Sequence, residues 1–274
     1  MEIKNKVVIV TGASSGIGEA TARQFGREGA KLVLAARRVD KLETLAQEIS
    51  AMNAGAETLV VQADLSKLED IQALIKQTID KFGRIDVLVN NAGFGRLDWL
   101  ENLDPVKDIQ SQFDVNVLGV IQTTRQTLPI MIKQRSGHII NMCSMAGLVA
   151  TPTYTVYAAC KHAVHGFSEA LRREVKPWGI DVSMIYPGGV ITEFQAHAGI
   201  KRKTNAATPK SLLLTADQVG SAVVQLVRRP RPMRILPWAW TFTVWMNRNL
   251  NALVDYTTIH RFTIPEREDE LNKK

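Results

Sequence analysis

The chain has 274 residues, of which 45% are hydrophobic and 22% are charged, a composition typical of a folded globular protein rather than a disordered one. Its two cysteines, Cys143 and Cys160, are too few for a disulfide framework or a cysteine-based zinc site. The net charge of +7 favours anionic ligands such as nucleotide phosphates or anionic lipid, although a modest positive excess also serves solubility.

Short apolar runs alternate with helix-like segments along most of the chain. The expected strands cover residues 6–10, 32–35, 58–61, 87–89, 138–142, 181–185 and 234–237. The expected helices cover residues 17–27, 40–54, 67–82, 105–134 and 155–174. Apolar strands alternating with helices predict an α/β fold, a doubly wound parallel sheet of Rossmann type with helices on both faces. We expect one domain over residues 1–237 and an aromatic-rich extension over residues 238–274.

The hydropathy of the sequence indicates neither export nor membrane insertion. The first residues lead directly into the short apolar run 6–10, which is too short for the apolar part of a signal peptide. No stretch of the sequence reaches the roughly 18 uninterrupted apolar residues of a membrane span. We therefore expect a cytoplasmic protein.

A glycine-rich turn, TGASSGIG, joins the first expected strand to the first expected helix at residues 11–18. At such a turn the backbone N–H groups and the helix dipole favour a dinucleotide pyrophosphate. The spacing differs from the more common G-x-G-x-x-G, and a glycine-rich turn without a ligand is the alternative. The candidate cofactor-binding residues here are Gly12, Ser14, Ser15, Gly16, Ile17 and Gly18.

Two arginines follow the second expected strand, where NAD-binding proteins usually carry an acidic residue for the ribose 2′-hydroxyl. Arg37 and Arg38 occupy that place, and the next carboxylate is Asp40. Arg37 can pair with a 2′-phosphate through charge-assisted hydrogen bonds. The alternative is a solvated strand end. We expect the cofactor NADP(H).

Tyr157 and Lys161 form the central catalytic candidate, because four residues on a helix bring both side chains to one face. A free tyrosine has a pKa of about 10, too high for a base at neutral pH. A nearby ammonium group and an oxidised nicotinamide would lower that pKa. Ser144, which follows the strand at 138–142, can donate a hydrogen bond to a substrate oxygen.

These features together resemble the short-chain dehydrogenase/reductase family over roughly residues 4–237. The resemblance rests on the glycine turn, on Ser144, Tyr157 and Lys161, and on further positions in the same order. It implies that Ser144 positions the substrate oxygen, that Tyr157 is the general acid or base, and that Lys161 binds the nicotinamide ribose and lowers the Tyr157 pKa. Asn116 would hold a proton-relaying water. The implied cofactor contacts are Asp64, Asn90, Ala92, Gly93, Pro187, Gly188, Val190 and Thr192, together with Tyr157 and Lys161.

The expected function is that of an NADP(H)-dependent oxidoreductase interconverting a ketone or aldehyde and an alcohol on a fairly apolar substrate. A 3-oxoacyl thioester reductase and a non-catalytic dinucleotide-sensing regulator are the alternatives. A sugar-nucleotide epimerase would need a longer substrate domain. We expect a homodimer or homotetramer, no nucleic-acid partner and no metal, since His138, His162 and His165 lack a metal-binding spacing.

Two later segments are less regular. Residues 192–215 are expected to close over the substrate, and the basic run 201–203 is interpreted as a solvated loop or an attractor for an anionic substrate. In the extension, apolar residues recur at helical spacing between Trp238 and Leu253. A stripe of this kind must be covered. We expect it to pack on its own domain or on a second subunit, with a helix lying on a membrane surface as the alternative.

Overall fold

Seven parallel strands form the central sheet of the computed structural model, which describes residues 1–53, 56–194, 198–199 and 209–271. Their spatial order is β3-β2-β1-β4-β5-β6-β9. The strands are β1 (Val7–Thr11), β2 (Lys31–Ala36), β3 (Thr58–Gln62), β4 (Val87–Asn90), β5 (Gly137–Met142), β6 (Ile180–Pro187) and β9 (Met233–Leu236). This confirms the predicted Rossmann-type sheet and each of its strands to within about two residues at either end.

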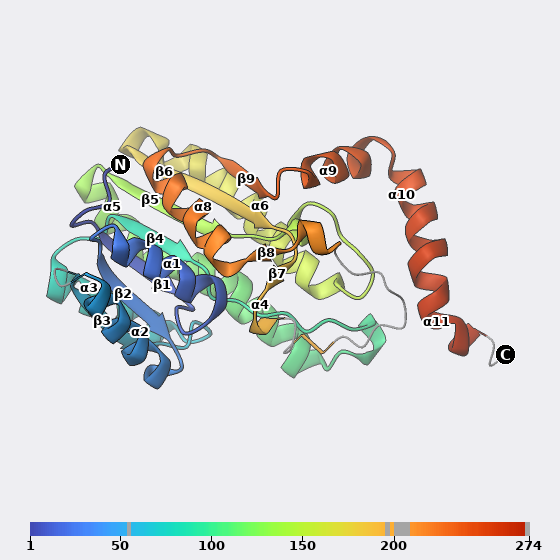
Figure 1. Ribbon diagram of the computed structural model, residues 1–274, viewed down its shortest axis with the longest axis horizontal. Helices are drawn as coiled ribbons and strands as arrows, with labels where there is room; N and C mark the ends of the chain where they lie inside the picture. The colour runs from blue at the N-terminus through green and yellow to red at the C-terminus, as the bar shows by residue number, and fades with distance from the viewer. Residues whose placement is uncertain (54–55, 195–197, 200–208, 272–274) are drawn as a thin grey trace.

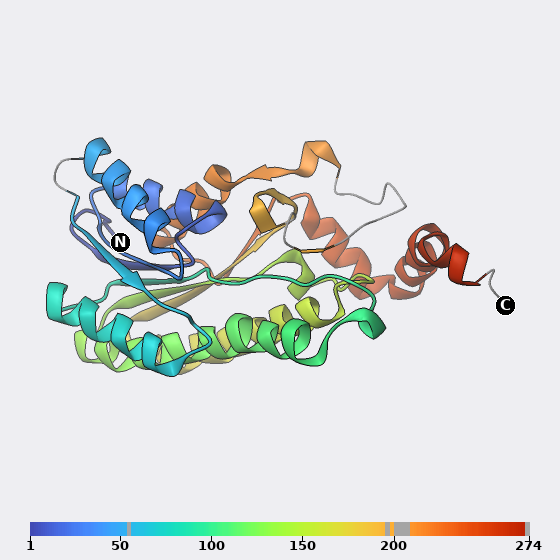
Figure 2. The same cartoon turned by 90° about the horizontal axis from the view of Figure 1, so that it is seen from below.

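Helices cover both faces of the sheet, as Figure 2 shows from its edge. Because successive side chains of a strand point to opposite faces, Val8 and Val10 of β1 enter one core while Val7 and Ile9 enter the other. The first core is closed by α1 (Gly16–Arg27), α2 (Val39–Met52) and α8 (Ala216–Arg228). The second is closed by α3 (Leu68–Phe82), α5 (Val120–Gln134) and α6 (Thr155–Val175).

The long helix predicted over residues 105–134 is present but not uniform. It consists of η2 (Pro105–Gln110), α4 (Ser111–Phe113), η3 (Asp114–Gly119) and α5, and η2 and η3 are π-helical turns. Such wider turns occur often at functional sites, and η3 carries Asn116. The α-helical spacing of apolar residues does not distinguish these π-helical turns from α-helical ones.

Helix α8 is absent from the sequence-based prediction. Its signal is nevertheless present, because Thr215 and Gln218 form a capping box at its start, a pattern that marks a helix N-terminus. Next to it, β7 (Val190–Ile191) pairs with β8 (Leu214–Thr215) in a small second sheet that the sequence analysis also missed.

The extension forms a chain of short helices beyond the end of the sheet, drawn in red in Figure 1. They are α9 (Trp240–Asn249), α10 (Asn251–Thr258), the π-turn η7 (Ile259–Thr263) and α11 (Ile264–Leu271). Trp240 lies against Gly188, and Val244 joins a core cluster of the domain. Near the other end, the Arg267 guanidinium lies 3.9 Å from the ring centroid of Trp99. Among the described helices, none is long and apolar enough to cross a membrane.

Candidate active site

The sheet reverses its strand order between β1 and β4, the position where open α/β sheets bind ligands beyond the carboxyl ends of their strands. Here hydrogen bonds join the loop after β1 to the loop after β4. The Thr11 hydroxyl donates to Val89 O and accepts from the N–H groups of Asn91 and Ala92 at 3.0 and 3.1 Å. The Asn91 side chain donates to Thr11 O at 2.9 Å. The glycine turn and the loop at 91–93 are therefore fixed to each other.

Two positions of the turn require glycine for specific structural reasons. Gly12 has φ +65°, and a Cβ there would lie 2.8 Å from Cα of Ala92. A Cβ on Gly18 would lie 2.2 Å from the carbonyl oxygen of Gly12, so only glycine lets α1 start this close to β1. Ser14, Ser15, Gly16 and Ile17 remain partly exposed beside the N-terminus of α1. Their predicted contact with a pyrophosphate stays a prediction.

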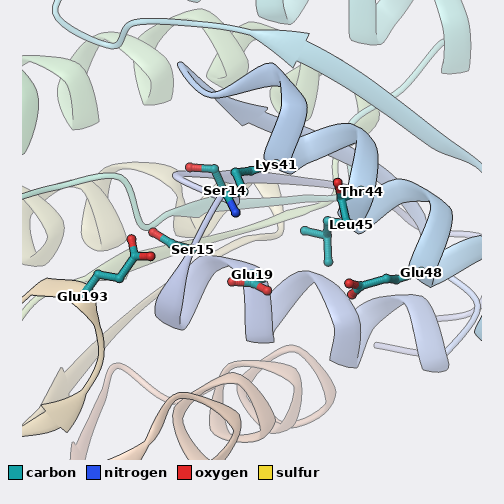
Figure 3. A pocket seen from close by; sticks show the side chains of 8 residues that line it. All are labelled: Ser14, Ser15, Glu19, Lys41, Thr44, Leu45, Glu48 and Glu193. Carbon is teal, nitrogen blue, oxygen red and sulfur yellow. The ribbon is translucent and has the colours of Figure 1, made fainter.

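Arg38 reaches back to the glycine turn. It donates to the hydroxyl and the carbonyl oxygen of Ser14, both at 3.3 Å, and it pairs with Glu193 at 3.3 Å. Figure 3 shows Glu193 with Ser14 and Ser15 around one pocket, which is also lined by Glu19, Lys41, Thr44, Leu45 and Glu48. Of the two predicted arginines, Arg38 is thus the one placed beside the turn and this pocket.

Arg37 lies near enough to Asp64 for its charge to act on that carboxylate. Partial burial of Asp64 opposes its ionisation. Hydrogen bonds from the Ser66 main chain and hydroxyl, with the charges of Arg37 and Lys67, nevertheless hold the Asp64 pKa below its ordinary value. Asp64 is therefore an anion whose oxygen Oδ1 is already occupied by Ser66 at 2.8 and 3.0 Å.

Ser144, Tyr157 and Lys161 are brought together at the carboxyl end of β5. Ser144 follows that strand, and Tyr157 and Lys161 lie in the first two turns of α6. The Lys161 ammonium lies 5.6 Å from the centroid of the Tyr157 ring and donates to Met142 O at 2.9 Å. The Tyr157 hydroxyl interacts with that of Ser144. The predicted constellation is thus assembled in three dimensions.

Burial is the main influence on the acidity of Tyr157. Burial raises the pKa of Tyr157 well above its ordinary value of 10, and the hydrogen bond with Ser144 only partly opposes this. Burial also lowers the pKa of Lys161. Loss of hydration thus outweighs the Ser144 hydrogen bond in the chain alone, and the lowering expected with an oxidised nicotinamide beside Tyr157 stays a prediction.

The cover over Tyr157 comes from the segment that follows β7. The ring of Phe194 lies 5.5 Å from that of Tyr157, and Ala198 packs in the same apolar cluster with Leu97. Thr192 lies close to Gly16, since a Cβ on Gly16 would meet its methyl group at 3.3 Å. Neither Glu193 nor Phe194 was a predicted site residue. The basic run 201–203 lies outside the described residues.

The side chains of two predicted site asparagines form hydrogen bonds within the chain. The Asn116 side chain accepts from Phe94 N at 3.0 Å and donates to Phe94 O at 2.7 Å, and its contact with a proton-relaying water stays a prediction. Asn90 is buried and donates to Asn141 and Thr124 at 2.8 and 3.0 Å. Its side chain therefore ties β4 to β5 and α5, and the contact of Asn90 with the cofactor stays a prediction.

The remaining predicted contacts surround these residues. Ala92 is partly exposed, and Gly93 is exposed next to Asn116 and Lys161. Pro187 ends β6, Gly188 N donates to Leu236 O at 2.7 Å, and Val190 is buried in β7. These residues border the switch point, and their contacts with a cofactor stay predictions.

The surroundings of Cys143, Cys160 and His138 indicate structural roles. Burial raises the pKa of the Cys143 and Cys160 thiols to about 11, which disfavours the reactive thiolate. His138 is buried, and its Nε2 lies 2.8 Å from the Ser183 hydroxyl. In the described part of the chain, no three histidine, cysteine or carboxylate side chains lie where they would hold a metal ion.

Comparison with known proteins agrees with this geometry. Residues 6–203 match the sequence model described as short chain dehydrogenase. The chain belongs to the short chain dehydrogenase family. It is 39% identical over 239 residues to an uncharacterized oxidoreductase of Listeria innocua, covering 86% of this chain and 95% of that protein.

Solved structures of the family superimpose over most of the chain. A short chain dehydrogenase/reductase from Burkholderia phymatum in complex with NAD has a TM-score of 0.83 at 30% identity, covering 92% of this chain and 96% of that one. An alcohol dehydrogenase from Thermococcus sibiricus complexed with 5-hydroxy-NADP has a TM-score of 0.76 at 32% identity, covering 85% and 96%. This member of the short chain dehydrogenase family is therefore an oxidoreductase by descent, and its fold is the family fold.

Proposed function

We propose that this chain is an NADP(H)-dependent oxidoreductase that interconverts a ketone or aldehyde and the corresponding alcohol on a fairly apolar substrate. The observation that carries the proposal is the grouping of Ser144, Tyr157 and Lys161 at the carboxyl end of β5. The apolar preference is supported by the neighbours of Tyr157, which are Leu97, Ala146, Ala158 and Ala198, with Tyr154 and Phe194 at their edge.

A nicotinamide dinucleotide fits the residues at the switch point. The relatives bind NAD in one structure and 5-hydroxy-NADP in another, so the choice between the two rests on this chain's own side chains. Arg38 with the Ser14 hydroxyl would hold a 2′-phosphate, and the turn beside the N-terminus of α1 would hold the pyrophosphate. The bound cofactor would supply or accept the hydride.

The chain's own residues would then handle the proton. The Ser144 hydroxyl would hold the substrate oxygen beside Tyr157, whose hydroxyl would donate a proton to that oxygen in reduction and remove it in oxidation. Lys161 would favour the phenolate through its charge and bind the cofactor ribose through the N–H groups that Met142 O leaves available. The intact Tyr157 and Lys161 pair argues against a purely regulatory, non-catalytic role.

The test is a pair of tyrosine variants assayed by NADPH consumption at about 340 nm across ketones, aldehydes and acyl thioesters. Tyr157→Phe removes only the hydroxyl, so turnover should fall by roughly 10²–10⁴ while NADPH still binds. Tyr154→Phe is the matched control, because its ring lies only 6.3 Å away, and it should keep most of the turnover. Comparable turnover in Tyr157→Phe and the native protein would exclude Tyr157 as the proton-transfer residue. A native preference for NADH would contradict the cofactor assignment.

Quaternary structure and location are further parts of the proposal. An apolar groove between α5 and α6, with Ile121, Leu128, Phe167 and Leu171 among its lining residues, supports the expected homodimer or homotetramer. The cytoplasm is the expected compartment, since NADPH is available there and cysteine thiols stay reduced.

A further inference from the structure

The extension crosses the carboxyl end of the sheet, the end at which the candidate active site lies. Figures 1 and 2 both show α9, α10 and α11 beyond the ends of the strands. The first of these helices is fixed to the domain by Trp240, which lies against Gly188, and by Val244, which packs in a cluster with Leu148. The last helix is fixed to a different part of the domain, the loop that follows β4.

The first of these two anchors borders the reacting end of the site. Met142 of β5 pairs with Ile185 of β6, and two residues farther along the two strands lead to Ser144 and Pro187. Neighbouring strands lie about 4.8 Å apart, so these two site residues are close together. The Trp240 indole packs against the residue after Pro187 and therefore lies at the border of the site.

The second anchor is a clamp on the loop after β4. The Arg267 guanidinium lies 3.9 Å from the centroid of the Trp99 ring, and its Nη2 lies 2.6 Å from Oε1 of Glu101. The ring of Phe262 lies 6.4 Å from that of Trp99. A guanidinium over an aromatic face is attracted by the ring quadrupole, and the ion pair holds the same side chain from a second direction. Arg267 thus contacts two residues of the loop at once.

The clamped loop also lines the site. Leu97, two residues before Trp99, is only 3% exposed and packs in the apolar cluster of Tyr157. Its N–H group donates to Ala198 O at 2.9 Å. A single residue therefore separates the side chain that packs near Tyr157 from the ring that Arg267 covers, and a shift of Trp99 should be felt at Leu97.

We propose that Arg267 is a positioning residue of the substrate site. By fixing the loop after β4 it holds Leu97 beside Tyr157, and the extension thereby forms the outer wall of the site. This inference rests on the proposed reduction of a ketone or aldehyde. A small ketone would be held mainly by Ser144 and Tyr157, whereas a long apolar ketone would also bury its chain against Leu97.

The test compares KM and kcat for NADPH-dependent reduction of 2-butanone and 2-octanone. Arg267→Gln should raise KM for 2-octanone about three- to tenfold, while KM for 2-butanone and Kd for NADPH stay almost unchanged. Arg267→Lys keeps the charge near Glu101 but loses the planar stacking on Trp99, so it should recover part of the loss. Arg261→Gln is the matched control, because it removes the same charge from an exposed position of η7. An equal rise of KM for both ketones, or no rise for either, would overturn the proposal.

Hydrogen–deuterium exchange of the full-length protein tests the clamp without a substrate. Arg267→Gln should speed exchange in residues 97–104 about three- to tenfold through local opening, and leave the glycine turn at 11–18 unchanged. Arg261→Gln should change neither region. If the native protein reduces neither ketone, the proposed function fails, and exchange still decides the role of Arg267. Unchanged exchange at 97–104 would overturn that role.

Discussion

Replacing Glu193 by glutamine should tighten the binding of NADPH. In the structure both terminal nitrogens of Arg38 lie 3.3 Å from one oxygen of Glu193, so a 2′-phosphate at Arg38 has to compete with this carboxylate. The two side chains are 44% and 54% exposed, and pairs in that setting contribute about 0.2–1 kcal/mol. Glu193→Gln should therefore raise NADPH affinity roughly 1.5- to fivefold. NADH affinity should stay almost unchanged, because NADH has no 2′-phosphate.

Fluorescence titration with both nucleotides measures the effect, and two controls define its origin. Glu48→Gln removes the same charge from the same pocket, but Glu48 pairs with Arg23 at 2.8 Å and should affect NADPH less. In an Arg38→Ala background, Glu193→Gln should have no effect, as a double-mutant cycle requires for a direct interaction. An equal gain for NADH, or a gain that survives loss of Arg38, would refute the competition.

Two further substitutions test the packing. Burial lowers the pKa of His138 from 6.5 to about 4, so between these pH values only the unfolded chain gains a proton there, and roughly 3 kcal/mol of stability present above pH 6.5 should be lost as the pH falls to 4. Urea unfolding of His138→Asn should show a flatter acid dependence than that of His260→Asn, an exposed control, and parallel curves would contradict the assignment. A Cβ at Gly188 would lie 2.4 Å from Nε1 of Trp240, so Gly188→Ala should loosen the extension at a cost of about 1–3 kcal/mol. Tryptophan emission and thermal unfolding measure this against Gly166→Ala, where a Cβ meets nothing within 4 Å, and equal effects would count against the contact.

The sheet was predictable because its determinants are local. Apolar runs such as 7–11 and 31–36 alternate with helical periodicity, and the lengths of the connections require parallel crossovers. The four-residue spacing on a helix and the position after the fifth expected strand predicted the grouping of Ser144, Tyr157 and Lys161. Helix α8 was predictable too, from the Thr215 capping box and the apolar spacing after it, and its omission was a missed signal.

Other features depend on contacts that no local pattern encodes. Arg38 and Glu193 are 155 residues apart in the chain. Their pairing follows only from the place where β7 ends. The inward turn of Asn90 depends on Thr124 and Asn141, which come from two other elements. The periodicity of the extension predicted an apolar stripe, but its contacts with the domain, such as those at Gly188 and Trp99, are tertiary.

Three consecutive residues join the two ends of the site. Thr192 lies against the glycine turn, Glu193 pairs with Arg38, and Phe194 packs on Tyr157. Because Glu193 and Phe194 are adjacent in the chain, a backbone movement that takes Glu193 away from Arg38 should also move Phe194 relative to Tyr157. The burial that this segment contributes raises the Tyr157 pKa, and a tyrosine with a raised pKa is a weak proton donor. A change in the backbone of residues 192–194 should therefore alter both the contact with Arg38 and the burial of Tyr157, and with that burial the Tyr157 pKa.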